Sequence, residues 1–230
     1  LSKVLKGNIL VVGNLTHTGQ HGIYFNQNEI TYTQFLEVLF EAVEKLQKEI
    51  KLEFNKTIRL ILFKDYFEKG LIHSEKDIFK THKFHKLLVQ PNMMMNIKDT
   101  WLTEQDYVGN MTTKYRARYK RARKKSKEIV VRELNLTELI NASKTLYSLY
   151  KNVSDNAAFN TFVLPENHFW SLKEGLRDNF KVFGYFLDNE LIGFYSLILN
   201  NEDLETYFLG YDSEHQYSNQ LYLNMLYDMA

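Results

Sequence analysis

Apolar residues recur at two different spacings along this chain of 230 residues, and the spacings predict alternating strands and helices. Short continuous apolar runs, NILVVGNL at 8–15 and IRLILF at 58–63, predict buried strands. From 31 to 50 the apolar residues recur at intervals of three and four, which predicts an amphipathic helix. The segments at 22–25 and 84–97 are expected to be extended. The first part of the chain therefore alternates strand, helix and strand.

The second part of the chain has a clearer pattern. A strand is expected at 128–134, followed by a helix capped at Asn135 and a second helix that begins near Pro165. Three apolar runs come next: KVFGYFLDN, ELIGFYSLILNN and DLETYFLGYD. Tight turns at 188–189 and 200–201 join them into an antiparallel meander. With a last helix after the meander, the predicted order is strand, helix, helix, strand, strand, strand, helix.

A basic segment lies between these two parts. One long helix is predicted over 103–127, because Thr103 and Asp106 have the spacing of a capping box. Its expected inward stripe is Tyr107, Met111, Tyr115, Arg118 and Ala122. The run at 114–127 holds nine Lys or Arg residues and no acid, and without them the net charge of +1 would be −8. The positive charge is therefore local, whereas general nucleic-acid binders usually spread it over a whole face.

Composition narrows the class of protein. The chain is 44% hydrophobic and 14% aromatic, which argues against a disordered or a fibrous protein. It has no cysteine, so disulfides, thiolate nucleophiles and thiolate metal sites are excluded. No apolar run approaches the roughly 20 residues of a membrane span, and no signal peptide is visible. A cytoplasmic protein without a membrane span is expected.

Three stretches resemble one superfamily. DNELIGFYSLILNNEDLETYFLGYD is similar to the meander of the GCN5-related N-acetyltransferases (GNAT). DYVGNMTTKYRARYKRARKK resembles the helix that joins the paired domains of Fem-type aminoacyltransferases and of related predicted N-acyltransferases, often labelled peptidoglycan biosynthesis proteins. GNLTHTGQHGIYF, with the helix and IRLILF that follow it, resembles the back half of a first such domain.

The resemblance implies an α/β (α+β) fold with a GNAT-like mixed sheet flanked by helices. Two partial units are expected: 1–100, starting at a fourth strand, and 129–230, truncated after a third helix. The basic helix at 101–128 would join them. The implied activity is transfer of an acyl or aminoacyl group to an amine by direct attack, in a bacterial cytoplasm. The donor would be acyl-CoA, an acyl carrier protein or aminoacyl-tRNA, with no tightly bound cofactor and no metal.

The candidate catalytic residues are Glu205, Tyr207 and Tyr211, which alternate along one expected strand and so should share a face. The resemblance implies that Glu205 takes the proton of the amine and that Tyr207 or Tyr211 protonates the leaving thiolate or hydroxyl. The alternative is a solvated strand whose tyrosines pack on a neighbour. The loop at 213–220 contains no glycine, which argues against the usual pyrophosphate site for CoA.

A second group of candidates lies in the glycine-marked loop after the first strand. His17, Gln20 and His21 could bind the acceptor amine, and histidine is the side chain best suited to deprotonate it near neutral pH. The alternative is that these are polar turn residues beside glycines that adopt positive φ.

The basic run allows three interpretations. It could bind an anionic donor or acceptor such as tRNA, an acyl carrier protein or a lipid-linked phosphate, with Lys114 and Arg116 facing the ligand. It could be an independent nucleic-acid arm, or it could be a solvated helix that balances an acidic body. For the whole chain, the alternative to a transferase is a non-catalytic binding module on the same scaffold, recognising an anionic polymer or carrier.

Overall fold

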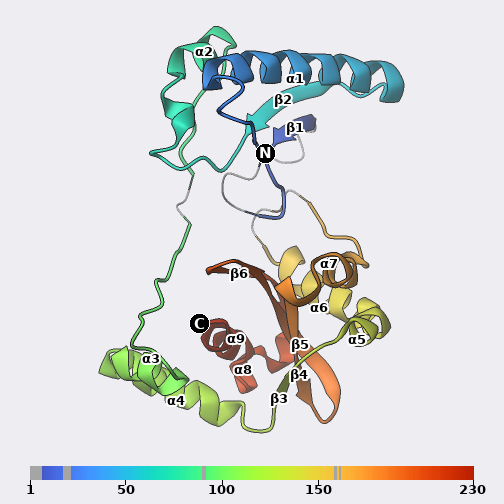
Figure 1. The fold of residues 1–230 in the computed structure, drawn as a ribbon. Helices are drawn as coiled ribbons and strands as arrows, with labels where there is room; N and C mark the ends of the chain where they lie inside the picture. Colours follow the sequence, from blue (N-terminus) through green and yellow to red (C-terminus); the bar gives the residue numbers. More distant parts are fainter. Residues whose placement is uncertain (1–6, 18–21, 90–91, 158–159, 161) are drawn as a thin grey trace. The chain divides into compact units, whose positions relative to one another are not determined.

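The chain divides into two compact units, Leu1–Met95 and Asn96–Ala230. The computed structural model describes residues 7–17, 22–89, 92–157, 160 and 162–230 (Figure 1). The basic helical segment belongs to the second unit by its contacts. The sequence had suggested boundaries at 100 and 128, with the basic helix as a separate joining element.

Unit 1 is built on two parallel strands with a helix between them. Its elements are β1 (Asn8–Val12), α1 (Tyr32–Phe54), β2 (Ile58–Phe63), the 3₁₀ turn η1 (Leu71–His73) and α2 (Lys76–Thr81). Parallel pairing of β1 with β2 requires a crossover connection, which α1 provides. The predicted strands and helix are confirmed, although the first strand is shorter and the helix longer than expected. The described residues of 22–25 and 84–97 form neither helix nor strand.

The first helix is fixed at its start by a cap and along its inner face by aromatic packing. The Thr31 hydroxyl accepts the Gln34 N–H at 3.3 Å, and the Gln34 side chain accepts the Thr31 N–H at 3.1 Å. Leu36, Phe40 and Val43 are buried. The ring of Phe40 contacts four further rings, with centroids 4.2 to 5.6 Å away: Phe63, Phe79, His82 and Phe84. Much of the buried contact in unit 1 is therefore between aromatic rings.

Unit 2 contains a four-stranded antiparallel sheet in the order β3-β4-β5-β6. The strands are β3 (Val130–Glu133), β4 (Phe180–Leu187), β5 (Glu190–Asn200) and β6 (Asp203–Tyr211). Asp188 and Asn189, between β4 and β5, have φ of 50° and 65°, a left-handed backbone that Asp and Asn tolerate in hairpin turns. Within the described part of the chain, β6 is an edge strand that pairs only with β5.

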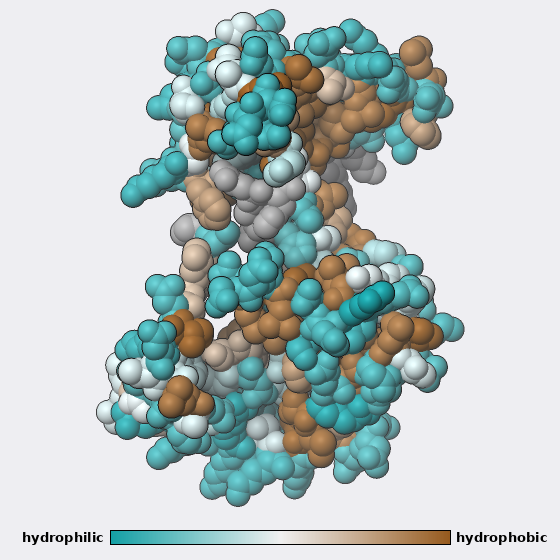
Figure 2. Space-filling view, viewed as in Figure 1, coloured by the Kyte–Doolittle hydropathy of each residue, from teal (hydrophilic) through white to brown (hydrophobic). Residues whose placement is uncertain are grey.

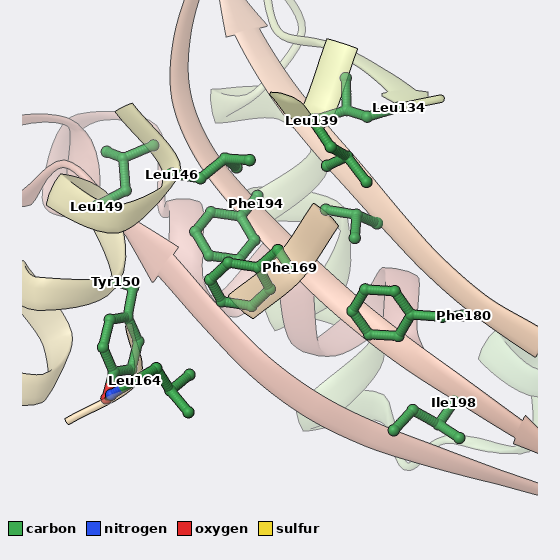
Figure 3. Close-up of a cluster of buried hydrophobic side chains, with 11 residues drawn as sticks. Leu134, Leu139, Leu146, Leu149, Tyr150, Leu164, Phe169, Phe180, Phe194 and Ile198 are labelled. Carbon is green, nitrogen blue, oxygen red and sulfur yellow. The ribbon is translucent and has the colours of Figure 1, made fainter. Parts of the chain in front are cut away.

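One face of this sheet is covered by three helices (Figure 1). They are α5 (Leu136–Asn141), α6 (Ser143–Asp155) and α7 (His168–Leu176), which leads into the 3₁₀ turn η2 (Arg177–Asn179). The buried side chains between helices and sheet form cluster one (Figure 3): Leu134, Leu139, Leu146, Leu149, Tyr150, Leu164, Phe169, Phe180, Val182, Phe194 and Ile198. The Phe169 and Phe194 rings meet edge to face, 4.8 Å apart, and join α7 to β5.

The other face is covered by α9 (Leu221–Met229), which follows the short α8 (Ser213–Ser218). The buried side chains on this face form cluster two: Tyr185, Ile192, Tyr195, Leu197, Leu221 and Met225. The four strands of unit 2 follow one another as predicted, and the α/β fold class is confirmed. The helices differ from the prediction: the first predicted helix forms two, α5 and α6, and the short α8 precedes the last one.

A glycine on β6 lets a helix backbone reach the strand. A Cβ atom at Gly210 would lie 2.4 Å from the Tyr150 nitrogen and 2.5 Å from the Leu149 carbonyl carbon, both in α6. Contacts of that length do not occur between real atoms, so any side chain here would push α6 from the sheet. Gly210 therefore sets the distance between α6 and β6.

The predicted single helix at 103–127 is wrong. The segment forms two helices, α3 (Glu104–Asn110) and α4 (Thr113–Lys125), because Met111 and Thr112 are extended, with ψ of 149° and 158°. Gly109 and Asn110 are weak helix formers and favour an end at this point. The predicted inward stripe is also wrong at Tyr115, which is 52% exposed, whereas Tyr119 and Ala122 are buried.

Candidate active site

The edge strand β6 carries a bulge. One residue of β5, Ser196, lies opposite two residues of β6, Tyr207 and Phe208. The Ser196 side chain is fully buried, and its hydroxyl donates a hydrogen bond to the Phe208 carbonyl at 2.6 Å. A bulge bends its strand, turns a side chain aside and takes backbone groups out of regular pairing. Such a distortion in an edge strand offers backbone groups to a ligand.

A histidine meets the strand at this bulge. His168 is the first residue of α7, and its Nε2 lies 2.9 Å from the Tyr207 hydroxyl. The two rings are nearly parallel, 22° apart, with centroids separated by 5.8 Å. The sequence analysis did not single out His168. Its position at a predicted helix start is visible in the sequence, but its contact with a residue 39 positions later is set by packing.

The predicted common face of Glu205, Tyr207 and Tyr211 is wrong. Glu205 pairs with Ile198, a member of cluster one, and Tyr207 packs against the same cluster on the α7 side. Tyr211 packs against cluster two on the α9 side. The bulge adds one residue to the strand, and this inverts the in-and-out alternation beyond it. Glu205, Tyr207 and His168 therefore share one side of β6.

The glycine-free segment at 213–220 forms a short helix rather than an open loop. Asp212 caps α8 through its side chain, which accepts the Glu214 N–H at 2.9 Å. The Gln216 side chain accepts the N–H of Tyr222, in the first turn of α9, at 3.1 Å. One of the free amides with which a helix start would hold a phosphate is thus already used.

Of the residues predicted in the first loop, only His17 lies within the described part of the chain. Gln20 and His21 lie outside it. The Lys64 ammonium donates to the backbone carbonyls of Asn14 at 2.7 Å and His17 at 3.1 Å. These contacts connect the end of β2 to the loop after β1. The proposed roles of His17, Gln20 and His21 stay predictions.

Most cations of α4 face solvent, and hydrophilic residues dominate its visible surface (Figure 2). The exposed ones are Lys114, Arg118, Lys120, Arg121, Lys124 and Lys125. Arg116 is partly buried, and its guanidinium donates to the Met111 carbonyl at 3.0 Å. Lys114 is therefore open to a ligand, whereas Arg116 is held within its own segment.

Arg123 is the cation of α4 that makes ion pairs within unit 2. Its Nη2 lies 2.6 Å from Glu104 Oε1 on α3, and its Nη1 lies 2.6 Å from Asp228 Oδ1 on α9. The Tyr119 hydroxyl also donates to Glu104, at 2.8 Å, and the Tyr185 hydroxyl donates to Asp228. One guanidinium thereby joins three helices, and two phenols complete the hydrogen bonds of the carboxylates.

These contacts change the ionisation of the groups. Burial raises the pKa of Tyr185 far above its usual value, and the Asp228 carboxylate raises it further because it repels a phenolate. Burial and then Asp228 likewise raise the pKa of Tyr195. Burial opposes ionisation of Glu104, but hydrogen bonds from Arg123 and Tyr119 outweigh it and lower the pKa of that carboxyl. Both phenols are therefore neutral near pH 7.

Two further features bear on the class of site. Within the described ranges, no group of three or more His, Asp or Glu side chains is placed to hold a metal ion. No helix in the same residues combines the length and the apolar character needed to cross a bilayer.

No protein-family profile matches the sequence. No curated protein matches it significantly. Solved acetyltransferase structures do show a partial likeness. A possible acetyltransferase from Clostridium difficile 630 is 16% identical with a TM-score of 0.34, over 44% of this chain and 68% of that one.

Two other solved structures are similar to the same extent. The PaiA N-acetyltransferase from Thermoplasma acidophilum, solved with coenzyme A, is 18% identical with a TM-score of 0.33. An aminoglycoside acetyltransferase from an uncultured soil metagenomic sample, solved with sisomicin, is 18% identical with a TM-score of 0.31. Each likeness covers 44% of this chain and 71% of the other.

Proposed function

We propose that this chain is an N-acyltransferase in which an amine attacks an activated acyl group directly. The observation that carries the proposal is the bulge at Tyr207 and Phe208 in an edge strand, beside His168. In such a reaction the amine nitrogen forms a bond to the acyl carbon, and the bond from that carbon to the leaving sulfur or oxygen breaks. The site must therefore bind a carbonyl oxygen and accept a proton.

Backbone amides of β6 are suited to bind the carbonyl oxygen of the acyl group. As the negative charge of a tetrahedral intermediate develops on the acyl oxygen, fixed N–H donors stabilise it without reorganisation. An edge strand has N–H groups on its outer side, and the bulge changes the direction of those nearest Tyr207. We assign the acyl carbonyl to this outer edge.

Glu205 and His168 are suited to accept the proton of the attacking amine. Both belong to the α7 side of β6, and Tyr207 lies against the imidazole of His168. The attacking amine would lose its proton to Glu205 or His168, and the leaving group would take one from Tyr207. Tyr211, on the α9 side, could act as an acid only from the opposite face.

The contacts of α8 and α4 bear on how the phosphates of an acyl donor could be bound. Because Ser213–Ser218 is helical and Gln216 occupies an amide of α9, a pyrophosphate would find few donors there. Acyl-CoA, an acyl carrier protein and aminoacyl-tRNA remain as donors, with the exposed cations of α4, Lys114 among them, as the partners of their phosphates. A Fem-like role in bacterial peptidoglycan synthesis is the finer version of this proposal.

A binding module on the same scaffold is the second candidate. The same occupied helix start favours it, because a protein without a donor site would recognise an anionic carrier through α4 alone. The two candidates differ in what substitutions at Glu205 should do.

The test is transfer of a labelled acyl group to a panel of primary amines, with acetyl-CoA, a loaded acyl carrier protein and aminoacyl-tRNA as separate donors. We expect one donor to support turnover, and Glu205→Gln or His168→Gln to lower it by about 10²-fold or more. Glu214→Gln, an exposed carboxylate on α8, is the matched control and should keep full activity. Absence of transfer with every donor, or full activity in both variants, would overturn the proposal.

A further inference from the structure

Five strongly exposed apolar side chains follow one another closely along the chain after α2. Leu87, Leu88 and Val89 are 78%, 83% and 79% exposed, and Met93 and Met94 are 101% and 81% exposed. All five belong to unit 1, and we call them the apolar run. A single exposed apolar residue is ordinary, whereas a group of them marks a surface that contacts another molecule.

The chain leaves the core of unit 1 at Phe84, just before the apolar run. The centroid of the Phe84 ring lies 5.1 to 5.9 Å from those of the rings of Phe40, Phe63 and Phe79. The Phe84 N–H donates to the Phe79 carbonyl at 2.8 Å. From 85 to 97, the described residues make no hydrogen bond or ion pair with any other described residue. Substitutions in the apolar run should therefore leave the core of unit 1 intact.

The charges beside the apolar run are positive. Between 78 and 98 the chain has four lysines and no Asp or Glu. Lys80 forms an ion pair with Asp77 at 3.6 Å. Lys83 and Lys86 are exposed, and neither forms an ion pair with a described residue. Two uncompensated cations therefore precede the apolar run directly, and they favour an anionic partner.

The order of the side chains favours a lipid surface over a protein partner. A peptide added to a protein sheet alternates its side chains between two faces, and a peptide helix places its apolar residues on one face. Here the apolar residues are consecutive, at 87–89 and 93–95, and the described residues of 84–97 form neither helix nor strand. A fluid lipid layer requires no fixed order of side chains, and methionine is flexible enough to adapt to it.

We propose that the apolar run binds an anionic lipid surface. Lys83 and Lys86 would contact the lipid phosphates, and the side chains of Leu88 and Met93 would enter the outer part of the acyl layer. The backbone would stay among the head groups, because unpaired amides and carbonyls are costly in hydrocarbon. This contact belongs to unit 1 and is independent of the acyl transfer proposed at β6 in unit 2.

Vesicle binding by the whole chain tests the proposal, with vesicles of phosphatidylcholine alone and vesicles that also contain phosphatidylglycerol. We expect the wild-type chain to sediment with the second kind only, and less of it to sediment as salt is raised. Leu88→Glu combined with Met93→Glu should weaken binding by about 10-fold or more. The matched control is Val38→Glu combined with Leu52→Glu, the same change of charge at exposed apolar residues of α1, and it should bind as wild type does.

A dye attached to the apolar run shows which surface meets the lipid. The chain has no cysteine, so Met93→Cys provides one attachment site for an environment-sensitive dye. Its fluorescence should increase with phosphatidylglycerol vesicles, whereas the same dye at Leu52→Cys should not respond. Equally tight binding to phosphatidylcholine vesicles, absence of binding by the wild-type chain, or equal binding by the two double variants would overturn the proposal. So would sedimentation without a response at Met93→Cys, which would assign the binding to another cationic surface such as α4.

Discussion

The Ser196 hydroxyl on β5 reaches across to the Phe208 carbonyl on β6 at 2.6 Å, at the point where the two strands lose register. Ser196 is 0% exposed, so no solvent can replace this donor. The hydrogen bond therefore stabilises the bulge, and with it the position of Tyr207 beside His168. An apolar residue at 196 would pack equally well but would leave the carbonyl without its donor.

Ser196→Ala should lower the free energy of unfolding by about 1–3 kcal/mol, because a buried carbonyl loses its hydrogen bond. Urea denaturation followed by circular dichroism measures this. Ser213→Ala, at an exposed serine on α8, should change stability by less than about 0.5 kcal/mol. Equal stability of the two variants would show that the hydrogen bond does not hold the bulge.

Gly210→Ala should be among the most damaging single substitutions in unit 2. The new methyl would lie 2.4 Å from the backbone of α6, and overpacking of this kind costs about 1–3 kcal/mol or more. Thermal denaturation should show a lower midpoint. Gly109→Ala in α3 is the matched control: no atom lies within 4 Å of its Cβ, and alanine should stabilise the helix by about 0.5–1 kcal/mol. A neutral Gly210→Ala would contradict the packing of α6 on β6.

The two helix starts in the basic segment should respond differently to the loss of a threonine. Thr103 caps α3, its hydroxyl accepting the Asp106 N–H at 3.3 Å, whereas Thr112 makes no side-chain cap for α4. Thr103→Ala should therefore cost about 1 kcal/mol and Thr112→Ala much less. Chemical denaturation of both variants under one set of conditions tests this, and equal losses would contradict it.

The carboxylate of Glu104 should make the free energy of unfolding decrease as the pH falls below about 5. Its pKa is lowered in the folded state, so its contribution is complete above the unfolded value of about 4.3. The contribution is lost as the pH falls through the folded pKa. Glu104→Gln should lower stability at pH 7 by about 1 kcal/mol, since the side chain is half exposed, and should flatten the loss of stability below about pH 5.

Urea midpoints measured from pH 3 to pH 7 provide that comparison. Glu214→Gln, at an exposed site on α8, serves as the control. If Glu104→Gln and wild type lose stability in parallel as the pH falls, the ion pair with Arg123 contributes nothing to the acid response.

The meander of unit 2 could be predicted because its signals are local. Asp188 and Asn189 adopt positive φ at low cost, so two adjacent positions determine where the chain reverses. The helix cap at Asn135 is local in the same way, since its partner Glu138 is three residues away. The break between α3 and α4 also had a local signal, because Gly109 and Asn110 are weak helix formers. The prediction of one helix over 103–127 did not take these two residues into account.

The arrangement around β6 could not be predicted in this way. A bulge places one extra residue in one of two paired strands, and the residue types of Tyr207 and Phe208 do not indicate where it falls. The role of Arg123 depends on Glu104 and Asp228, which are 19 and 105 positions away in the sequence. The run at 114–127 holds nine Lys and Arg residues, and only the packing of α3, α4 and α9 distinguishes Arg123 from the others.

The contact at Gly210 has a mechanical consequence. A side chain between a helix and a strand can change rotamer and absorb a small shift, but here backbone lies directly against backbone. Any displacement of α6 near Tyr150 is therefore transmitted to β6 without attenuation, and it reaches the bulge only two residues away. The packing of α6 and the direction of the backbone amides at the bulge are therefore mechanically coupled.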